Sequence, residues 1–165
     1  MRPELPTGVV TLLFTDIEGS TRLLSELRGG YVEALAEHRR IIRAALGEHE
    51  GAEVDTQGDA FMAAFARATD AVDAAIAIQR GLVGGPVKVR IGLHTGEVEP
   101  TGHDYFGPVV NRAARIVDLA NGNQIVCSSS TATMLREVEL RSEGIHELRG
   151  IGTDEVFMVL GPDFE

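Results

Sequence analysis

Cysteine and long apolar runs are almost absent from this sequence. Its 165 residues include a single cysteine, Cys127, which excludes an internal disulfide. No apolar run approaches the ~18 residues that a membrane-spanning helix needs, and residues 1–6 lack the apolar core of a signal peptide. We therefore expect a reducing, cytoplasmic setting, no membrane segment in this chain and a packing role for Cys127.

Basic residues are scarce as well. The chain has 15 Lys and Arg residues against 25 Asp and Glu, which gives a formal net charge of −10. A nucleic-acid-binding domain usually presents a basic face that displaces counterions from phosphate, so we expect no nucleic-acid partner. All the basic residues except Lys88 are arginines. Because the planar guanidinium suits phosphate and carboxylate, some arginines are candidates for specific oxyanion contacts, although codon bias would explain most of them.

What is present fits one globular domain. The chain has a mass of 17.7 kDa and is 44% hydrophobic, which is enough for a single core and too little for two. We therefore predict a single domain over residues 1–165.

The hydrophobic pattern predicts strands and helices in alternation. Val9–Phe14 is a nearly continuous apolar run, typical of a buried central strand. Apolar residues then recur at helical spacing as far as Leu46, with a break expected at Gly29-Gly30. The other predicted elements are a hairpin over Glu53–Phe65 with its turn at Gln57-Gly58, a helix capped by Thr69, a strand over Val87–Val98, a helix over Pro108–Leu119, a strand over Gln124–Cys127, a short helix after Ser129, and strands near Glu139–Leu148 and Val156–Leu160.

This order indicates an α+β fold of the ferredoxin-like (split βαβ) type, extended by a C-terminal α/β portion. Helices mainly cover one face of a largely antiparallel sheet in this arrangement. The other face must be covered too, and a partner subunit is one way to cover it. His94 lies in an apolar strand and is expected to be a hydrogen-bonded core histidine rather than a ligand.

Two aspartates are candidates for metal chemistry. Asp16 follows the first strand, where a glycine-containing loop leads into a helix, and Asp59 lies in the hairpin corner. If the hairpin pairs beside the first strand, both carboxylates reach the same end of the sheet. Paired carboxylates suit two Mg²⁺ or Mn²⁺ ions that take their remaining ligands from substrate phosphates. Taken alone the pair is also compatible with ordinary turn chemistry, in which Asp is common.

Four segments, in order and covering essentially the whole chain, resemble the class III nucleotidyl cyclase catalytic domain. Asp16 and Asp59 are 43 residues apart, which is the spacing that the family keeps between its two metal-binding aspartates. The segments are Phe14–Thr21 (FTDIEGST), Gly58–Phe61 (GDAF), Val89–Gly96 (VRIGLHTG) and Asp104–Arg115 (DYFGPVVNRAAR).

The resemblance implies a two-metal site and a phosphate loop. Asp16 and Asp59 would bind the metals, together with the backbone carbonyl of Ile17. Phe14 and Thr15 open the substrate-binding segment. The loop that follows would hold the β- and γ-phosphates through its N–H groups, and its residues are Ile17, Glu18, Gly19, Ser20 and Thr21.

The resemblance also implies roles for residues further along the chain. Arg90 would contact the triphosphate, Asn111 would orient the ribose, and Arg115 would stabilise charge on the α-phosphate. Asp104 would accept a hydrogen bond from the adenine amino group. In this family the two sets of residues come from different subunits, so a homodimer that makes cyclic AMP from ATP is implied.

Two positions depart from the family pattern. Asp55 stands where the family has a lysine that reads adenine or a glutamate that reads guanine; an ionised Asp55 suits the guanine donors, whereas Asp104 suits the adenine amino group. Ile151 stands where the family has a lysine on the triphosphate, and Arg149 is two positions earlier. GTP as substrate, or a weak or inactive cyclase-like module that binds nucleotide or a partner, are therefore the alternatives.

Overall fold

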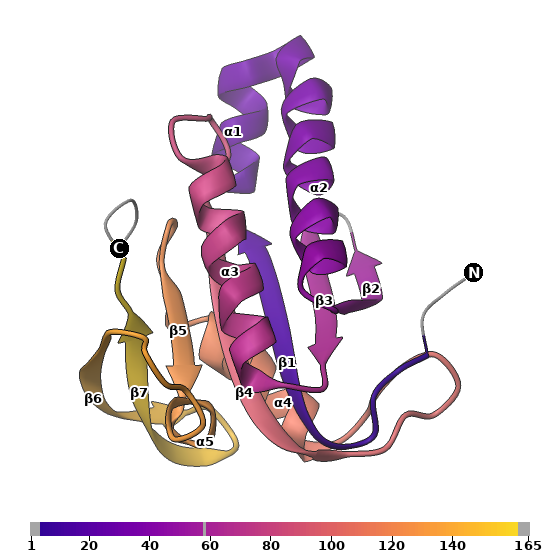
Figure 1. Cartoon of the computed structure of the whole chain (residues 1–165). Coiled ribbons are helices and arrows are strands. Elements are labelled where there is room, and N and C mark those ends of the chain that lie inside the picture. Colours follow the sequence, from indigo (N-terminus) through magenta and orange to yellow (C-terminus); the bar gives the residue numbers. More distant parts are fainter. Residues whose placement is uncertain (1–3, 58, 162–165) are drawn as a thin grey trace.

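The computed structural model describes residues 4–57 and 59–161. In this part of the chain seven strands form one sheet, in the order β2-β3-β1-β4-β5-β7-β6 (Figure 1). The predicted α+β class is confirmed. The strands are β1 (Gly8–Ile17), β2 (Ala52–Gln57), β3 (Ala60–Phe65), β4 (Val89–Val98), β5 (Ile125–Ser128), β6 (Leu140–Leu148) and β7 (Gly152–Val159).

The helices connect these strands. α1 and α2 lie between β1 and β2, α3 follows the β2–β3 hairpin, and α4 links the parallel pair β4 and β5. No helix in the described residues combines the length and the apolar character needed to cross a membrane. The helices are α1 (Ser20–Leu27), α2 (Tyr31–Glu48), α3 (Ala68–Leu82), α4 (Pro108–Val117) and α5 (Ser129–Ala132), with a 3₁₀ turn over Arg28–Gly30.

β1 is the central strand, as its apolar run predicts. It pairs antiparallel with β3 on one side and with β4 on the other. Its side chains alternate between two apolar layers: Leu13 and Ile17 join the core under α2 and α3, whereas Val10 and Leu12 join the core on the α4 side. Figure 1 shows α2 and α3 in front of the sheet and α4 behind it.

α4 therefore covers part of the face that was expected to be open. It lies almost directly on the backbone of β4, because Gly92 and Gly96 leave room for it. A Cβ atom on Gly92 would lie 2.6 Å from the Cα of Val117, and one on Gly96 would lie 2.7 Å from Cγ2 of Val109. Only glycine allows this close approach.

Most predicted boundaries are within two residues of the observed ones, and the break at Gly29-Gly30 is confirmed. Thr69 is not the N-cap of α3: Arg67 occupies that position with extended backbone, and Ala68 already belongs to the buried face of the helix. α4 ends at Val117, two residues before the predicted end. Gly58 of the predicted hairpin turn lies outside the described residues.

Candidate active site

Asp16 occupies the penultimate position of β1 and faces β4. Its Cα partner across the strands is Arg90, whose Nη2 donates to Oδ2 of the carboxylate in an ion pair. Both side chains are partly exposed, at 32% for Asp16 and 25% for Arg90. The alternation along β1 places Asp16 on the α4 side of the sheet, with Leu12 and Phe14. Arg90 thus lies next to the carboxylate that the sequence predicts to be a metal ligand.

Asp59 lies at the same end of the sheet. β3 begins at Ala60, and Phe61 pairs with Thr15 of β1, so the register brings the start of β3 beside the end of β1. The charge of Asp59 also acts on His38 of α2, where it opposes the effect of burial; burial prevails and lowers the pKa of His38. The expectation that the hairpin brings Asp16 and Asp59 to one end of the sheet thus agrees with the strand register.

The donor set at this end fits a hard divalent cation. In the described residues no three side chains of His, Cys, Asp or Glu gather closely enough to hold a metal. Two carboxylates and the backbone carbonyl of Ile17 therefore leave coordination positions for substrate phosphates and water, an arrangement that Mg²⁺ prefers over an all-protein cage. The sequence assignment of Asp16, Asp59 and Ile17 stays a prediction.

The predicted phosphate loop forms the start of α1. Gly19 adopts a left-handed conformation, with φ 63° and ψ 42°, and is the N-cap of the helix, while Ser20 and Thr21 form its first turn. Amide groups at a helix start carry partial positive charge and point outward, as a phosphate site requires. The Glu18 amide donates to the Lys88 carbonyl at 2.8 Å, and the Glu18 carboxylate accepts a hydrogen bond from the Gly122 amide.

The base-reading side of the predicted site is a shallow hollow on the α4 face. Phe14 and Asp55 line a space of about 150 Å³ together with Ala60, Phe61 and Met62. Met62 of β3 lies between Phe14 and Asp55, because it is the cross-strand partner of Phe14 on β1 and of Asp55 on β2. Thr15 points to the other face, is 2% exposed and has no hydrogen-bond partner for its hydroxyl among the described residues. Only the backbone of Thr15 is therefore available to a ligand on the Asp16 face.

Asp104 lies on the loop before α4, where Thr101 and Asp104 form an isolated bridge. Its Oδ1 accepts a hydrogen bond from the Tyr105 amide at 2.7 Å. Tyr105 anchors the loop, because it is 1% exposed and its hydroxyl donates to the Pro6 carbonyl at 2.5 Å. Burial raises the pKa of Tyr105 to about 12, so the phenol stays protonated as this hydrogen bond requires. No contact in the described residues joins Asp104 to Asp55.

α4 carries the other two predicted catalytic residues. Asn111 is exposed on the helix, and Nε of Arg115 donates to the Arg149 carbonyl at 3.2 Å. Arg115 and Arg149 also line a hollow of about 260 Å³ between α4 and the β6–β7 turn. Ile151, at the position of the expected lysine, packs against a small apolar cluster. In the described residues no hydrogen bond or ion pair joins Asn111 or Arg115 to Asp16 or Asp59, because Arg115 bonds the Arg149 carbonyl and Asp16 pairs with Arg90.

A family model of the adenylate and guanylate cyclase catalytic domain matches residues 3–161. This chain belongs to that family. The resemblance found in the four sequence segments is therefore confirmed.

Individual relatives agree with the family. An uncharacterized protein of Mycobacterium tuberculosis (strain ATCC 25618 / H37Rv) is 40% identical over 162 residues, which cover 94% of this chain and 56% of that protein. The adenylate cyclase of Podospora anserina is 34% identical over 155 residues, covering 75% of this chain and 7% of that protein. The chain therefore spans about half the length of the mycobacterial relative and a small part of the fungal one.

Solved cyclases share the fold. A structure of adenylate cyclases from Trypanosoma brucei, described in their monomeric state, superposes with a TM-score of 0.87 at 27% identity. The superposition covers 95% of this chain and 91% of the trypanosome chain.

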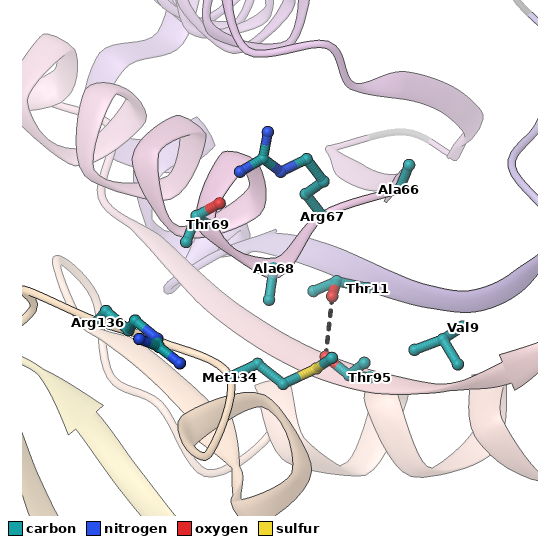
Figure 2. A pocket seen from close by; sticks show the side chains of 9 residues that line it. All are labelled: Val9, Thr11, Ala66, Arg67, Ala68, Thr69, Thr95, Met134 and Arg136. Atoms are coloured by element: carbon teal, nitrogen blue, oxygen red, sulfur yellow. Dashed lines mark hydrogen bonds between the residues drawn. The ribbon is translucent and has the colours of Figure 1, made fainter.

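A further hollow in the described part of this cyclase domain is lined by none of the predicted site residues. Figure 2 shows the residues that line it, near the N-terminal ends of β1 and α3, with the hydroxyls of Thr11 and Thr95 hydrogen-bonded at 2.8 Å. Its volume is about 350 Å³, and its lining includes Arg67 and Arg136. The predicted residues Phe14, Asp55 and Arg115 line smaller hollows instead.

His94 and Cys127 have the structural roles expected of them. His94 is 6% exposed and its Nδ1 lies 2.7 Å from the Ser128 hydroxyl. Burial, and then the positive charge of Arg112, lower the pKa of His94 to about 4, so the ring is neutral. Burial raises the pKa of the Cys127 thiol to about 12, which leaves it unreactive.

Sequence reasoning missed one polar cluster beside α4. Nη1 of Arg112 lies 3.3 Å from Oδ2 of Asp154 on β7, and the Ser129 hydroxyl donates to Oδ1 of Asp154 at 2.6 Å. Arg112 directly follows Asn111, but Asp154 is 42 residues further along the chain. Only that adjacency to Asn111 pointed to Arg112, and nothing in the sequence pointed to Asp154.

Proposed function

We propose that this cyclase domain converts ATP to 3′,5′-cyclic AMP and pyrophosphate at sites shared between two copies of the chain. The observation that carries the proposal is that two complementary sets of residues have no hydrogen bond or ion pair with each other in the described part of one chain. Asp16, Asp59 and the start of α1 offer a metal and phosphate half-site, whereas Asn111 and Arg115 on α4 offer ribose and α-phosphate contacts. Two copies facing each other would complete two such sites, as expected of an isologous dimer.

The reaction is an in-line displacement within one nucleotide. The ribose 3′-oxygen loses its proton and attacks the α-phosphorus, and the bond from that phosphorus to the pyrophosphate oxygen breaks. When bound, Mg²⁺ or Mn²⁺ supplies the acidity of the 3′-hydroxyl and neutralises part of the pyrophosphate charge.

The protein would supply positioning and fixed positive charge, which phosphoryl transfer chiefly needs. Arg115 would face the α-phosphate with its two Nη nitrogens, because its Nε is already held by the Arg149 carbonyl. Arg90 would turn from Asp16 toward the triphosphate once a cation neutralises that carboxylate. The amides at the start of α1 would bind the β- and γ-phosphates.

Base selection rests on Asp55 and Asp104. Asp104 fits the adenine amino group without any change of protonation, and relatives named adenylate cyclases support ATP. Asp55 at the hollow beside Phe14 favours GTP instead, because a carboxylate pairs with the guanine N1–H and amino donors. One well-placed hydrogen bond to a base is worth about 1–3 kcal/mol, so we expect a modest preference for ATP.

The first test is turnover of ATP and GTP by the purified protein with Mg²⁺ or Mn²⁺, separating products by chromatography. We expect cyclic AMP as the main product. Asp16→Ala and Asp59→Ala are each expected to lower kcat at least a thousandfold, because each removes a cation ligand. Glu97→Ala, an exposed carboxylate on β4, is the matched control and should retain wild-type turnover.

Undiminished turnover by both aspartate variants would contradict the proposal. Nucleotide binding by calorimetry with no product under Mn²⁺ would instead support a regulatory, non-catalytic module. That second function is favoured by Ile151, whose apolar packing removes the cationic contact expected at its position.

A further inference from the structure

α4 is attached to the β6–β7 hairpin by two polar contacts. Nη1 of Arg112 lies 3.3 Å from Oδ2 of Asp154 on β7. One turn further along the helix, Nε of Arg115 donates to the Arg149 carbonyl in the turn between β6 and β7. The helix that carries both Asn111 and Arg115 is therefore held from one side by one hairpin.

Asp154 is the most enclosed member of this group. Its side chain is 9% exposed, against 26% for Arg112. Oδ1 accepts hydrogen bonds from the hydroxyl of Ser129 at 2.6 Å and from its amide at 3.4 Å, and Oδ2 faces Arg112. One carboxylate thus joins β7, α5 and α4, and both of its oxygens are occupied. A carboxylate this buried requires such partners, since burying an unpaired charge is strongly unfavourable.

The surface under α4 is flat at two positions. The helix rests on Gly92 and Gly96, which present no side chains to interlock with it. Its buried residues Ala113, Ile116 and Val117 keep it against the sheet, and the polar contacts of Arg112 and Arg115 add directional constraints to this apolar packing. Each residue of a helix is turned about 100° from the one before, so an anchor at Arg112 fixes the direction of Asn111.

We propose that Asp154 is a positioning residue for the cyclase reaction. With Ser129 and Arg112 it locks the rotation of α4, so that Asn111 and Arg115 are presented together to the nucleotide on the partner copy. Asp154 itself touches no substrate and acts only through α4. This inference rests on the function proposed above.

The kinetic test compares Asp154→Asn with Glu155→Gln. Asn keeps the volume of Asp154 and an oxygen for Ser129 but loses the charge that holds Arg112. Glu155 is the neighbouring exposed carboxylate, which bonds the Ser142 hydroxyl on β6, and it serves as the matched control. We expect Asp154→Asn to lower kcat at least tenfold with KM for ATP within twofold. Glu155→Gln should leave both constants within twofold of the wild type.

The second kinetic test asks whether the losses of kcat in two single variants combine in the double variant. Arg112→Met should lower kcat as Asp154→Asn does, and the double variant should show no further loss, because both changes break one contact. A double variant whose loss of kcat equals the product of the two single losses would overturn the proposal. So would a kcat of Asp154→Asn within twofold of the wild type, provided that the wild type is active.

Hydrogen exchange gives a readout that does not need turnover. Amides of residues 112–117 in α4 should exchange at least tenfold faster in Asp154→Asn, whereas amides of β1 should keep wild-type rates. Unchanged exchange rates in α4 would overturn the proposal, because the substitution would then have no effect on the helix. Equal acceleration in α4 and β1 would also overturn it, because that pattern indicates general destabilisation. If the wild-type protein makes no cyclic nucleotide, the proposed function fails while exchange still decides the role of Asp154.

Discussion

His94 illustrates how the fold sets the charge of a single residue. Its ring lies among buried polar groups near the end of β5, hydrogen-bonded to Ser128 and close to Arg112. Burial and the neighbouring guanidinium both disfavour the imidazolium form, so the pKa falls from the ordinary 6.5 to about 4. The ring is consequently a neutral part of the core at physiological pH.

The lowered pKa of His94 predicts a loss of stability in mild acid. Between pH 7 and pH 5 the unfolded chain takes up a proton at His94 that the folded chain refuses, so the free energy of unfolding falls. For a pKa shift from 6.5 to about 4, the free energy of unfolding falls by about 2 kcal/mol between pH 7 and pH 5. Urea denaturation at pH 7 and pH 5 should show this loss in the wild type and a smaller loss in His94→Asn.

His103→Asn provides the control, because His103 is exposed on the loop before α4. It should keep the wild-type pH dependence. A His94→Asn protein that loses as much stability as the wild type between the two pH values would contradict the role given to this ring.

At the scale of elements, the contact between α4 and β4 leaves no room for an added side chain at Gly92. A methyl group at Gly92 would meet the Val117 Cα at 2.6 Å and the Val117 amide nitrogen at 2.7 Å. These are backbone atoms, which cannot move aside as a flexible side chain could. The position of the helix with Asn111 and Arg115 is therefore set by the absence of a side chain on the strand.

Gly92→Ala should displace α4 and destabilise the domain. Overpacking of this kind typically costs about 1–3 kcal/mol, and we expect the free energy of unfolding to fall by that amount in urea denaturation. Gly47→Ala is the matched control: it lies in α2 with nothing within 4 Å of the added Cβ. That change should stabilise the protein by up to about 1 kcal/mol, since alanine favours a helix. Equal midpoints for Gly92→Ala and the wild type would refute the close approach.

Elements governed by local patterns could be predicted, and those governed by distant contacts could not. The apolar run from Val9 predicts β1, and Gly29-Gly30 predicts the break between α1 and α2, because each signal lies within a few residues. The start of α3 was misplaced at Thr69, since burial of Ala68 outweighs the capping preference of a threonine. Asp154 was missed because only the folded sheet brings β7 against α4.

At the scale of the whole molecule, the proposed site divides between two copies of the chain. One copy would give Asp16 and Asp59, and the other would give Asn111 and Arg115. The sequence could supply these residues through their motifs, but the pairing of one copy with another depends on surfaces that no local pattern describes. The dimer therefore stays a prediction and needs a direct test.

Mixing two inactive variants tests this division. Asp16→Ala and Arg115→Ala proteins should each be inactive alone, because each variant damages both sites of its homodimer. After mixing in equal amounts, half of the dimers are mixed and each has one intact site, so activity should recover to about a quarter of the wild type. Mixing Asp16→Ala with Asp59→Ala should give no recovery, since both changes damage the same half-site. Equal activity in the two mixtures would rule out shared sites.

The strand order separates the two halves of this site in time during synthesis. β1 to β4 pair with one another at three junctions, and all four strands are complete at Val98. Asp16 and Arg90 lie on these strands, and Asp59 lies in the corner between β2 and β3. α4 comes later and packs directly on β4, and the β6–β7 hairpin joins the edge of β4 through β5. At ~10 residues per second a ribosome needs several seconds to add them. A newborn chain thus passes through an interval in which Asp16, Asp59 and Arg90 have been synthesised while α4, the helix that we propose completes the site, is still being made.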